Sequence, residues 1–129
     1  MNNTLTYKLD TQRRLFIKKD LEELNLWISS LENFNVELDH FSAIEKQLIR
    51  DHSTLSLIQG LRRRNVLCMA MLCKYNQELT TEYDYGKTEY NLSRAKIHDK
   101  KREQFLEHLK EFNSFKNNFY KLLMKYKLK

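Results

Sequence analysis

Residues that end helices and make turns are almost absent from this chain. It contains no proline and only two glycines, Gly60 and Gly86. Proline and glycine are the strongest local signals for turns, so the chain can reverse its direction only a few times. The long stretches between these glycines are rich in Leu, Glu, Lys and Gln, whose side chains lose little freedom in a helix. Because a sheet needs many turns, the sequence predicts an all-α fold built from long helices.

Length and composition favour one domain without a membrane anchor. The chain has 129 residues, of which 41% are hydrophobic, and this suits a single small core. Residues 1–8 lack the apolar run of a signal peptide, and charges interrupt every apolar run elsewhere. Cys68 and Cys73 point about 140° apart on a helix, so they cannot bridge each other. We read both as reduced core or near-core residues and expect a soluble, cytoplasmic protein.

A first long helix is expected over residues 11–50, after a loose segment at residues 1–9 that shows no hydrophobic period. Residues 10–129 then form a single helical domain. The apolar residues of the first helix advance in steps of three and four, the heptad spacing of a coiled coil or narrow bundle: Ile17, Leu21, Leu24, Ile28 and Leu31. After Leu31 the spacing restarts at Phe34, Leu38 and Phe41, which indicates a slip in the heptad phase.

Two further helices are expected, over residues 54–83 and 87–127. Asp51-His52-Ser53-Thr54 supplies good capping residues, so the first reversal is placed there, and Gly86 suits the end of the second helix. Short turns make neighbouring helices antiparallel, and the predicted fold is an elongated antiparallel three-helix bundle with coiled-coil-like packing. In the alternative there are four helices, because Ser42-Ala43-Ile44-Glu45 has capping-box form and would break the first helix near Ser42.

The second and third helices each have an expected inner face. That of the second helix comprises Ile58, Leu61, Asn65, Cys68, Leu72, Tyr75 and Leu79, and that of the third comprises Phe105, Leu109, Phe112, Phe115, Phe119, Leu122 and Tyr126. The stripe of the third helix is aromatic in its C-terminal half and polar near His98 and Arg102. We therefore expect phenylalanine side chains to pack one end of the bundle and the other end to be looser or wetter.

Candidate catalytic and metal-binding motifs are incomplete. Glu37 and His40 form a Glu-x-x-His pair of the kind that di-iron four-helix proteins use, but no second pair follows. Cys68 and His98 are expected on facing helices and offer two ligands, fewer than the three or four that zinc requires. No glycine-rich phosphate loop occurs, and no nucleophile has a recognisable motif around it. The sequence predicts a non-enzymatic protein with no metal, cofactor or small-molecule substrate.

The stretch Val66–Cys73 is apolar on all sides, which is typical of a helix contacted from more than one direction. With Cys68 facing inward, Val66, Ala70 and Cys73 fall on the opposite side, with Met69 beside them. An apolar patch left open there indicates an interface. The leading hypothesis is an interaction or structural module that homodimerises or docks a protein partner through Val66, Met69, Ala70 and Cys73. Alternatively, the outer helices wrap far enough to bury this face.

The positive charge of the chain is concentrated at its C-terminal end. The net charge is +6, and residues 94–129 carry 11 Lys or Arg against 4 Asp or Glu. This surplus supports an alternative function, in which the chain binds nucleic acid or an anionic membrane surface. The candidate residues are Arg62, Arg63, Arg64, Lys121, Lys125 and Lys129. Structural roles compete with this reading, since the arginines can pair with acids of the first helix and the lysines can offset a helix dipole.

Overall fold

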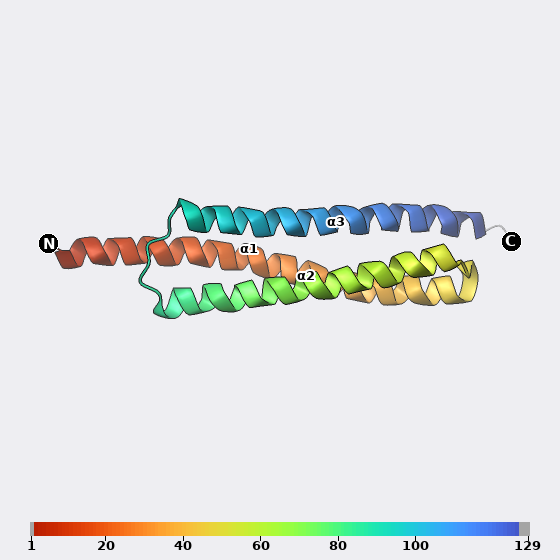
Figure 1. Cartoon of the computed structure of the whole chain (residues 1–129), viewed down its shortest axis with the longest axis horizontal. Coiled ribbons are helices and arrows are strands. Elements are labelled where there is room, and N and C mark those ends of the chain that lie inside the picture. The colour runs from red at the N-terminus through yellow and green to blue at the C-terminus, as the bar shows by residue number, and fades with distance from the viewer. Residues whose placement is uncertain (1, 127–129) are drawn as a thin grey trace.

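Three long helices make up the computed structural model, which describes residues 2–126 (Figure 1). Helix α1 spans Asn2–Ile44 and continues into a π-helical turn, η1, over Glu45–Ile49. Helix α2 spans His52–Tyr85 and α3 spans Leu92–Tyr126. Residues 2–126 contain no strand, so the prediction of an all-α three-helix bundle is confirmed. The first helix is unbroken at Ser42, which rules out the four-helix alternative.

Two helix boundaries differ from those expected. Residues 2–9 are helical rather than loose, and α1 extends past the other two helices at that end (Figure 1). Nothing in this segment interrupts a helix, and the Thr11 hydroxyl donates to the Tyr7 carbonyl at 2.9 Å. Helix α3 starts at Leu92 instead of residue 87, because the Asn91 side chain accepts from the Arg94 amide at 3.1 Å and caps the helix there. Residue 1 and residues 127–129 lie outside the described part, so the predicted end of the third helix at residue 127 falls there.

The first reversal uses the capping residues that the sequence offered. The Arg50 amide donates to the Glu45 carbonyl at 2.7 Å, and Arg50 adopts a left-handed conformation with φ of 51°. Asp51 then caps α2 by accepting from the Thr54 amide at 3.3 Å and from its hydroxyl at 2.8 Å. At the other end of α2, Gly86 is the C-cap and donates to the Glu82 carbonyl. Both predicted turns are therefore confirmed.

The core of α1 follows one heptad pattern without a slip. Its buried residues advance in steps of three and four: Ile17, Asp20, Leu24, Trp27, Leu31, Phe34, Leu38 and Phe41. The predicted phase change after Leu31 is wrong, because Asp20 and Trp27 occupy core positions that the aliphatic pattern had given to Leu21 and Ile28. The side chains of Leu21 and Ile28 are half-buried at the edge of the core.

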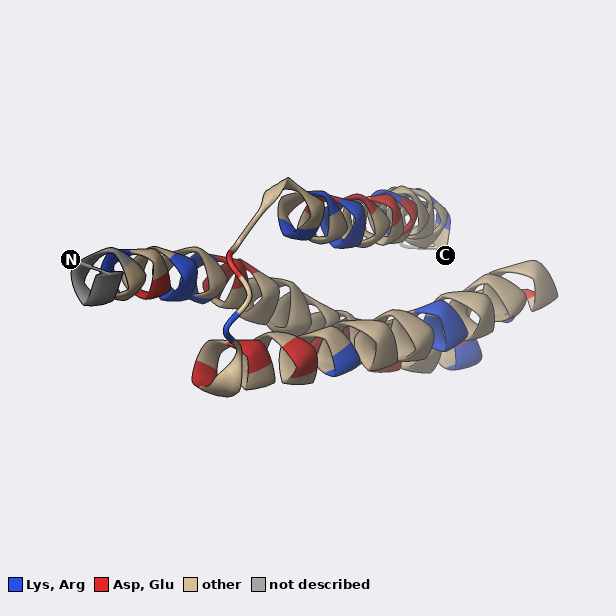
Figure 2. Ribbon diagram, turned by 60° about the vertical axis from the view of Figure 1, so that its left-hand side comes forward, with Lys and Arg blue, Asp and Glu red and all other residues tan. Residues whose placement is uncertain are grey.

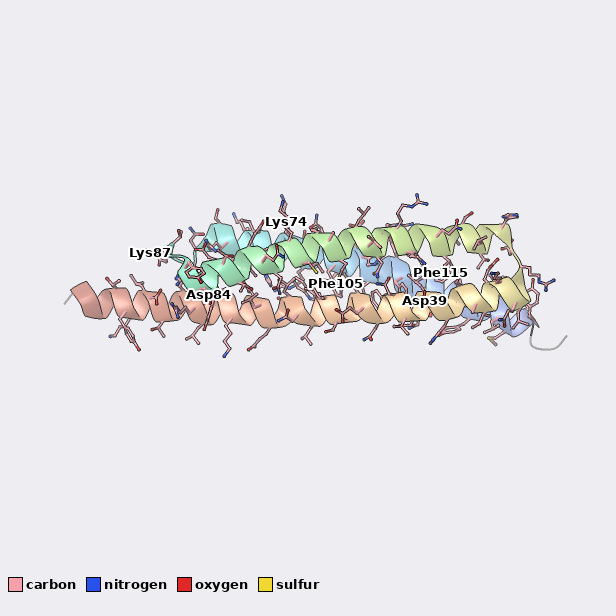
Figure 3. The ribbon with its side chains drawn as sticks, turned by 90° about the horizontal axis from the view of Figure 1, so that it is seen from below. Asp39, Lys74, Asp84, Lys87, Phe105 and Phe115 are labelled. Atoms are coloured by element: carbon pink, nitrogen blue, oxygen red, sulfur yellow. The ribbon has the colours of Figure 1, made fainter. Side chains whose placement is uncertain are left out.

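Helices α1 and α2 form a closely packed pair, and α3 lies beside it (Figure 2). Aromatic rings of α1 and α3 pack against each other, among them those of Phe105 and Phe115 on α3 (Figure 3). The rings of Phe34 and Phe112 stack with centroids 4.1 Å apart, and those of Phe41 and Phe119 lie 4.7 Å apart. This confirms that phenylalanine packs one end of the bundle. The buried stripe of α3 uses His108 where Leu109 was expected. No helix among the described residues is long and apolar enough to span a membrane.

Candidate functional site

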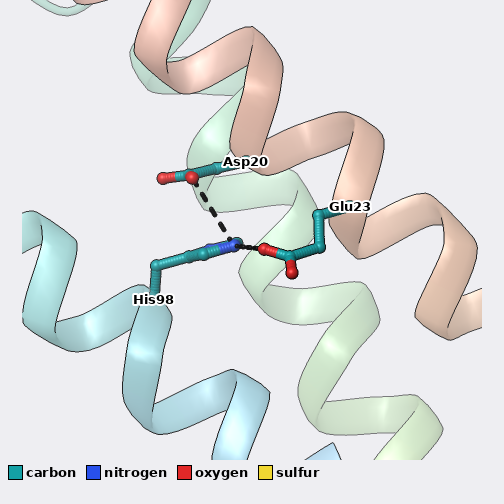
Figure 4. A group of neighbouring side chains, drawn as sticks. All are labelled: Asp20, Glu23 and His98. Carbon is teal, nitrogen blue, oxygen red and sulfur yellow. Dashed lines mark hydrogen bonds and ion pairs between the residues drawn. The ribbon is translucent and has the colours of Figure 1, made fainter.

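A group of ionisable side chains, of which Asp20 and His98 are buried, lies toward the end of the bundle away from the Phe41 and Phe119 rings. Asp20 and Glu23 lie three residues apart on α1 and therefore share one face of that helix. His98 faces them from α3 (Figure 4). Asp20 is 7% exposed and His98 is 2% exposed, so both residues have little contact with solvent. Charged groups removed from water to this extent are costly unless they are paired.

The imidazole of His98 has a partner at each ring nitrogen. Its Nε2 lies 2.7 Å from Glu23 Oε1 and 3.5 Å from Asp20 Oδ1, while Nδ1 lies 2.7 Å from the hydroxyl of Tyr75. A carboxylate can only accept, so Nε2 carries the proton that is donated to Glu23. In a neutral imidazole Nδ1 then accepts from the Tyr75 hydroxyl. Trp27 stacks on the ring at 5.1 Å and helps to fix its plane.

Separate donors hold the two carboxylates. Arg102 donates from Nε to Glu23 Oε2 at 2.9 Å and from Nη2 to Oε1 at 2.6 Å, and this bidentate pair lowers the pKa of Glu23 to about 2. The Tyr90 hydroxyl donates to Asp20 Oδ2 at 2.5 Å. Burial, followed by the hydrogen bond to Asp20, raises the pKa of Tyr90, so this donor keeps its proton.

A second polar layer lies nearer the middle of the bundle. Asn65 is fully buried, and its Nδ2 donates to the Leu31 carbonyl at 3.0 Å and to Asn35 Oδ1 at 2.8 Å. His108 Nε2 lies 2.9 Å from Asn65 Oδ1 and donates to it. Burial lowers the pKa of His108, which favours the neutral ring. This layer joins all three helices through side chains of complementary hydrogen-bonding type.

The two incomplete metal-binding motifs found in the sequence, Glu37 with His40 and Cys68 with His98, form no shared site in the structure. Glu37 pairs with Lys116 at 2.8 Å, and His40 is exposed, so the Glu-x-x-His pair builds no shared site. Cys68 is half-buried beside His108 at the surface between α2 and α3, rather than beside His98. Burial raises the pKa of the Cys68 thiol, which disfavours the thiolate that binds metals.

The predicted interaction face of α2 is largely on the surface. Val66 is 58% exposed, and Ala70 and Cys73 are exposed. Helices α1 and α3 therefore do not wrap around to bury this face, and the expectation of a near-core Cys73 is wrong. Met69 differs from the other three, because it is half-buried and packs against the core.

The candidate polyanion-binding residues are partly neutralised within the chain. Arg62 pairs with Asp39 of α1 at 2.9 Å, and Arg64 pairs with Glu111 of α3. Arg63 is exposed and makes no ion pair with any described residue. Lys121 and Lys125 are exposed near the end of α3. Lys129 lies outside the described residues.

Sequence reasoning named His98 and Arg102 as a polar stretch but missed their acidic partners. The available signal was Asp20, which stands between Ile17 and Leu24 at the step that continues the heptad. A carboxylate at such a position predicts a buried partner, although it does not say which helix supplies it. Comparison with known proteins identifies no relative, since no family model, curated protein or solved structure matches this chain.

Proposed function

We propose that this chain is a non-enzymatic helical module that self-associates through the outer face of α2. The observation that carries this proposal is a second heptad on α2, opposite the buried one, which we call the outer seam. It consists of Arg63, Val66, Ala70, Cys73, Gln77, Thr80 and Asp84, all of them exposed. These residues follow the same steps of three and four as the buried face, and the spacing suits a helix that packs on a second partner.

Cys73 stands at the centre of the seven outer-seam residues, so the seam can be aligned with a second copy that runs in the opposite direction. In a two-fold antiparallel pair centred on Cys73, Ala70 would face Gln77 of the second copy and Val66 would face Thr80. Such a pair is isologous, so every contact occurs twice. The five inner residues are uncharged and two of them are small, which permits close approach of the two helices.

The charges at the ends of the outer seam favour a second copy of this chain as the partner. The same antiparallel alignment places Arg63 opposite Asp84. Both are exposed, and neither makes an ion pair within residues 6–126. They are 21 positions apart on one helix, or about 30 Å, so they cannot meet within one chain. Lys74, which follows Cys73 in the sequence, also points away from the bundle, so this side of α2 faces solvent (Figure 3).

Molecular mass in solution tests this proposal. We expect a dimer whose population rises with concentration by light scattering after gel filtration, and we expect Val66→Glu to make the chain monomeric by burying two carboxylates at the interface. Leu26→Glu is the matched control, because Leu26 is 69% exposed on α1, and this variant should remain dimeric. A wild-type chain that stays monomeric at millimolar concentration would contradict self-association. The outer seam would then be a candidate only for docking a different protein.

Cysteine oxidation tests the alignment as well as the association. The centre of the proposed pair places Cys73 next to its symmetry mate, whereas Cys68 is half-buried on another side of α2. Mild oxidation should therefore give a disulfide-linked dimer in the wild-type chain and in Cys68→Ser, but not in Cys73→Ser. Equal cross-linking in both variants would contradict the alignment.

A second candidate function is contact with an anionic membrane surface at the end of α3. Exposed apolar residues, Leu48, Tyr120 and Met124, lie there with Lys121 and Lys125. Apolar side chains beside lysines are typical of helices that lie on anionic lipid. Flotation with phosphatidylserine vesicles should then recover the chain, whereas phosphatidylcholine vesicles and Met124→Glu should not. Equal recovery with both lipids would contradict this candidate.

A further inference from the structure

The cluster around His98 contains more negative than positive charge. Arg102 faces Glu23 and Asp99, and it makes no contact with Asp20. The partners of Asp20 are the neutral Tyr90 hydroxyl at Oδ2 and His98 at Oδ1, the latter at a longer 3.5 Å. The Asp20 side chain is 10% exposed, so a cation bound beside it would replace contacts with water that burial has removed.

We propose that Asp20, Glu23 and His98 form a binding site for one divalent transition-metal ion, of which Zn²⁺ is the representative. The donor set is two carboxylate oxygens and one imidazole nitrogen, a combination that such ions accept in proteins. The proposal concerns the polar end of the bundle and does not depend on the self-association of α2.

The three donor atoms already lie near the positions that a metal requires. One carboxylate oxygen of Asp20, one of Glu23 and one ring nitrogen of His98 lie within 4.8 Å of one another. Metal–ligand bonds of about 2.0–2.2 Å separate neighbouring ligands by about 3.0–3.5 Å. The 3.5 Å between His98 and Asp20 meets this requirement as it stands, and the 2.7 Å between His98 and Glu23 needs to open by about 0.5 Å. The Glu23 side chain is 34% exposed, and the change requires it to rotate away from Arg102 Nη2, which donates to Oε1 at 2.6 Å.

Neighbouring side chains orient the two carboxylates. Tyr90 holds Asp20 Oδ2, which leaves Oδ1 toward His98. Arg102 donates to both oxygens of Glu23, so Oε1 has to release its 2.6 Å hydrogen bond from Arg102 Nη2 when it binds a metal. Such outer contacts orient metal ligands and tune their basicity. When Nε2 binds a metal, the proton of a neutral His98 moves to Nδ1, and the Tyr75 hydroxyl changes from donor to acceptor at that nitrogen. The proton count of the site is unchanged by this exchange.

A surface cavity borders one of the three donor residues. It has a volume of about 350 Å³ and is lined by Asp20, Tyr75, Glu82 and Tyr90, among others, whereas Glu23 and His98 do not line it. Three protein ligands leave a fourth position for water, as in zinc sites that keep one open position. The same residues also form a closed ion-pair network without a metal, and measured stoichiometry separates the two possibilities.

Zinc titration of the chelator-stripped full-length chain tests the proposal. Cys68→Ser/Cys73→Ser is the background for all samples, so that thiols contribute no binding. We expect one Zn²⁺ per chain at pH 7.5 by calorimetry against a competing chelator, with affinity reduced about 100-fold or more in His98→Gln and Asp20→Asn. His40→Gln and His52→Gln replace exposed histidines and should bind as the background does.

Circular dichroism of each variant shows whether a lost site reflects a lost fold. If His98→Gln unfolds, the comparison rests on Asp20→Asn and on zinc-dependent thermal stabilisation of the background chain, which should disappear in Asp20→Asn. Failure of the background chain to bind stoichiometric zinc would overturn the proposal. Equal affinity in Asp20→Asn, or equal loss in His40→Gln, would overturn it as well.

Discussion

A Cβ atom at Gly60 would meet only the guanidinium of Arg64, at an ordinary contact distance of 3.7 Å. No backbone of a neighbouring helix comes within 4 Å of that position, so close approach of another helix does not require this glycine. Gly60→Ala should therefore stabilise the chain by about 1 kcal/mol, because alanine loses less backbone entropy in a helix. Urea denaturation measures the change. Gly86→Ala is the contrasting variant and should destabilise, since its Cβ would lie 2.5 Å from the Glu82 carbonyl oxygen.

The ionised Glu23 side chain makes the free energy of unfolding depend on pH in the acid range. Its pKa falls from 4.5 to about 2 on folding, mainly through the hydrogen bonds from Arg102. The unfolded chain takes up this proton at higher pH than the folded chain does, so the stabilisation is complete above pH 4.5 and is lost as pH falls toward 2. In Glu23→Gln we expect the free energy of unfolding to depend less on pH in this window. An unchanged slope in denaturation series from pH 5 to 2 would contradict this assignment.

The Asn65 layer shows how polar residues fix the register of three helices. A buried asparagine in a heptad core specifies alignment at some cost in stability. Asn65→Leu alone leaves the His108 donor without its acceptor and should destabilise by about 1–3 kcal/mol. His108→Leu in that background removes the orphaned donor, so the double variant should be more stable than the sum of the single effects predicts. A double-mutant cycle by denaturation measures the coupling, expected at about 0.5–3 kcal/mol, and additive effects would contradict it.

The three elements were predictable from sequence because the chain offers so few places to turn. Asp51 and Gly86 marked both reversals, and the inner face of α2 emerged from its spacing alone. The core of α1 was harder, because the pattern placed Leu21 and Ile28 at two positions that Asp20 and Trp27 occupy in the structure. Spacing shows that a position is buried, but partners such as Tyr75 and Tyr90 come from other helices. Their contacts depend on the axial alignment of the bundle, which a single sequence does not specify.

Across the whole molecule, the middle helix α2 has a buried face that contacts both neighbours and an exposed outer seam that repeats the heptad. No other helix of the described residues packs against the outer seam. Because Arg63 and Asp84 are about 30 Å apart in one chain, any electrostatic contact between them must join two copies. This separation makes reciprocal charge exchange a direct test of the proposed assembly.

Sedimentation equilibrium of four chains tests the central claim: the wild type, Arg63→Glu, Asp84→Arg and the double variant. Each single change sets like charges opposite each other twice per dimer, and should weaken association on the order of 10-fold. The double variant restores opposite charges only across an antiparallel pair, so its dissociation constant should return to within about 2-fold of the wild-type value. A double variant no better than either single one, or a wild-type chain that never dimerises, would contradict the account.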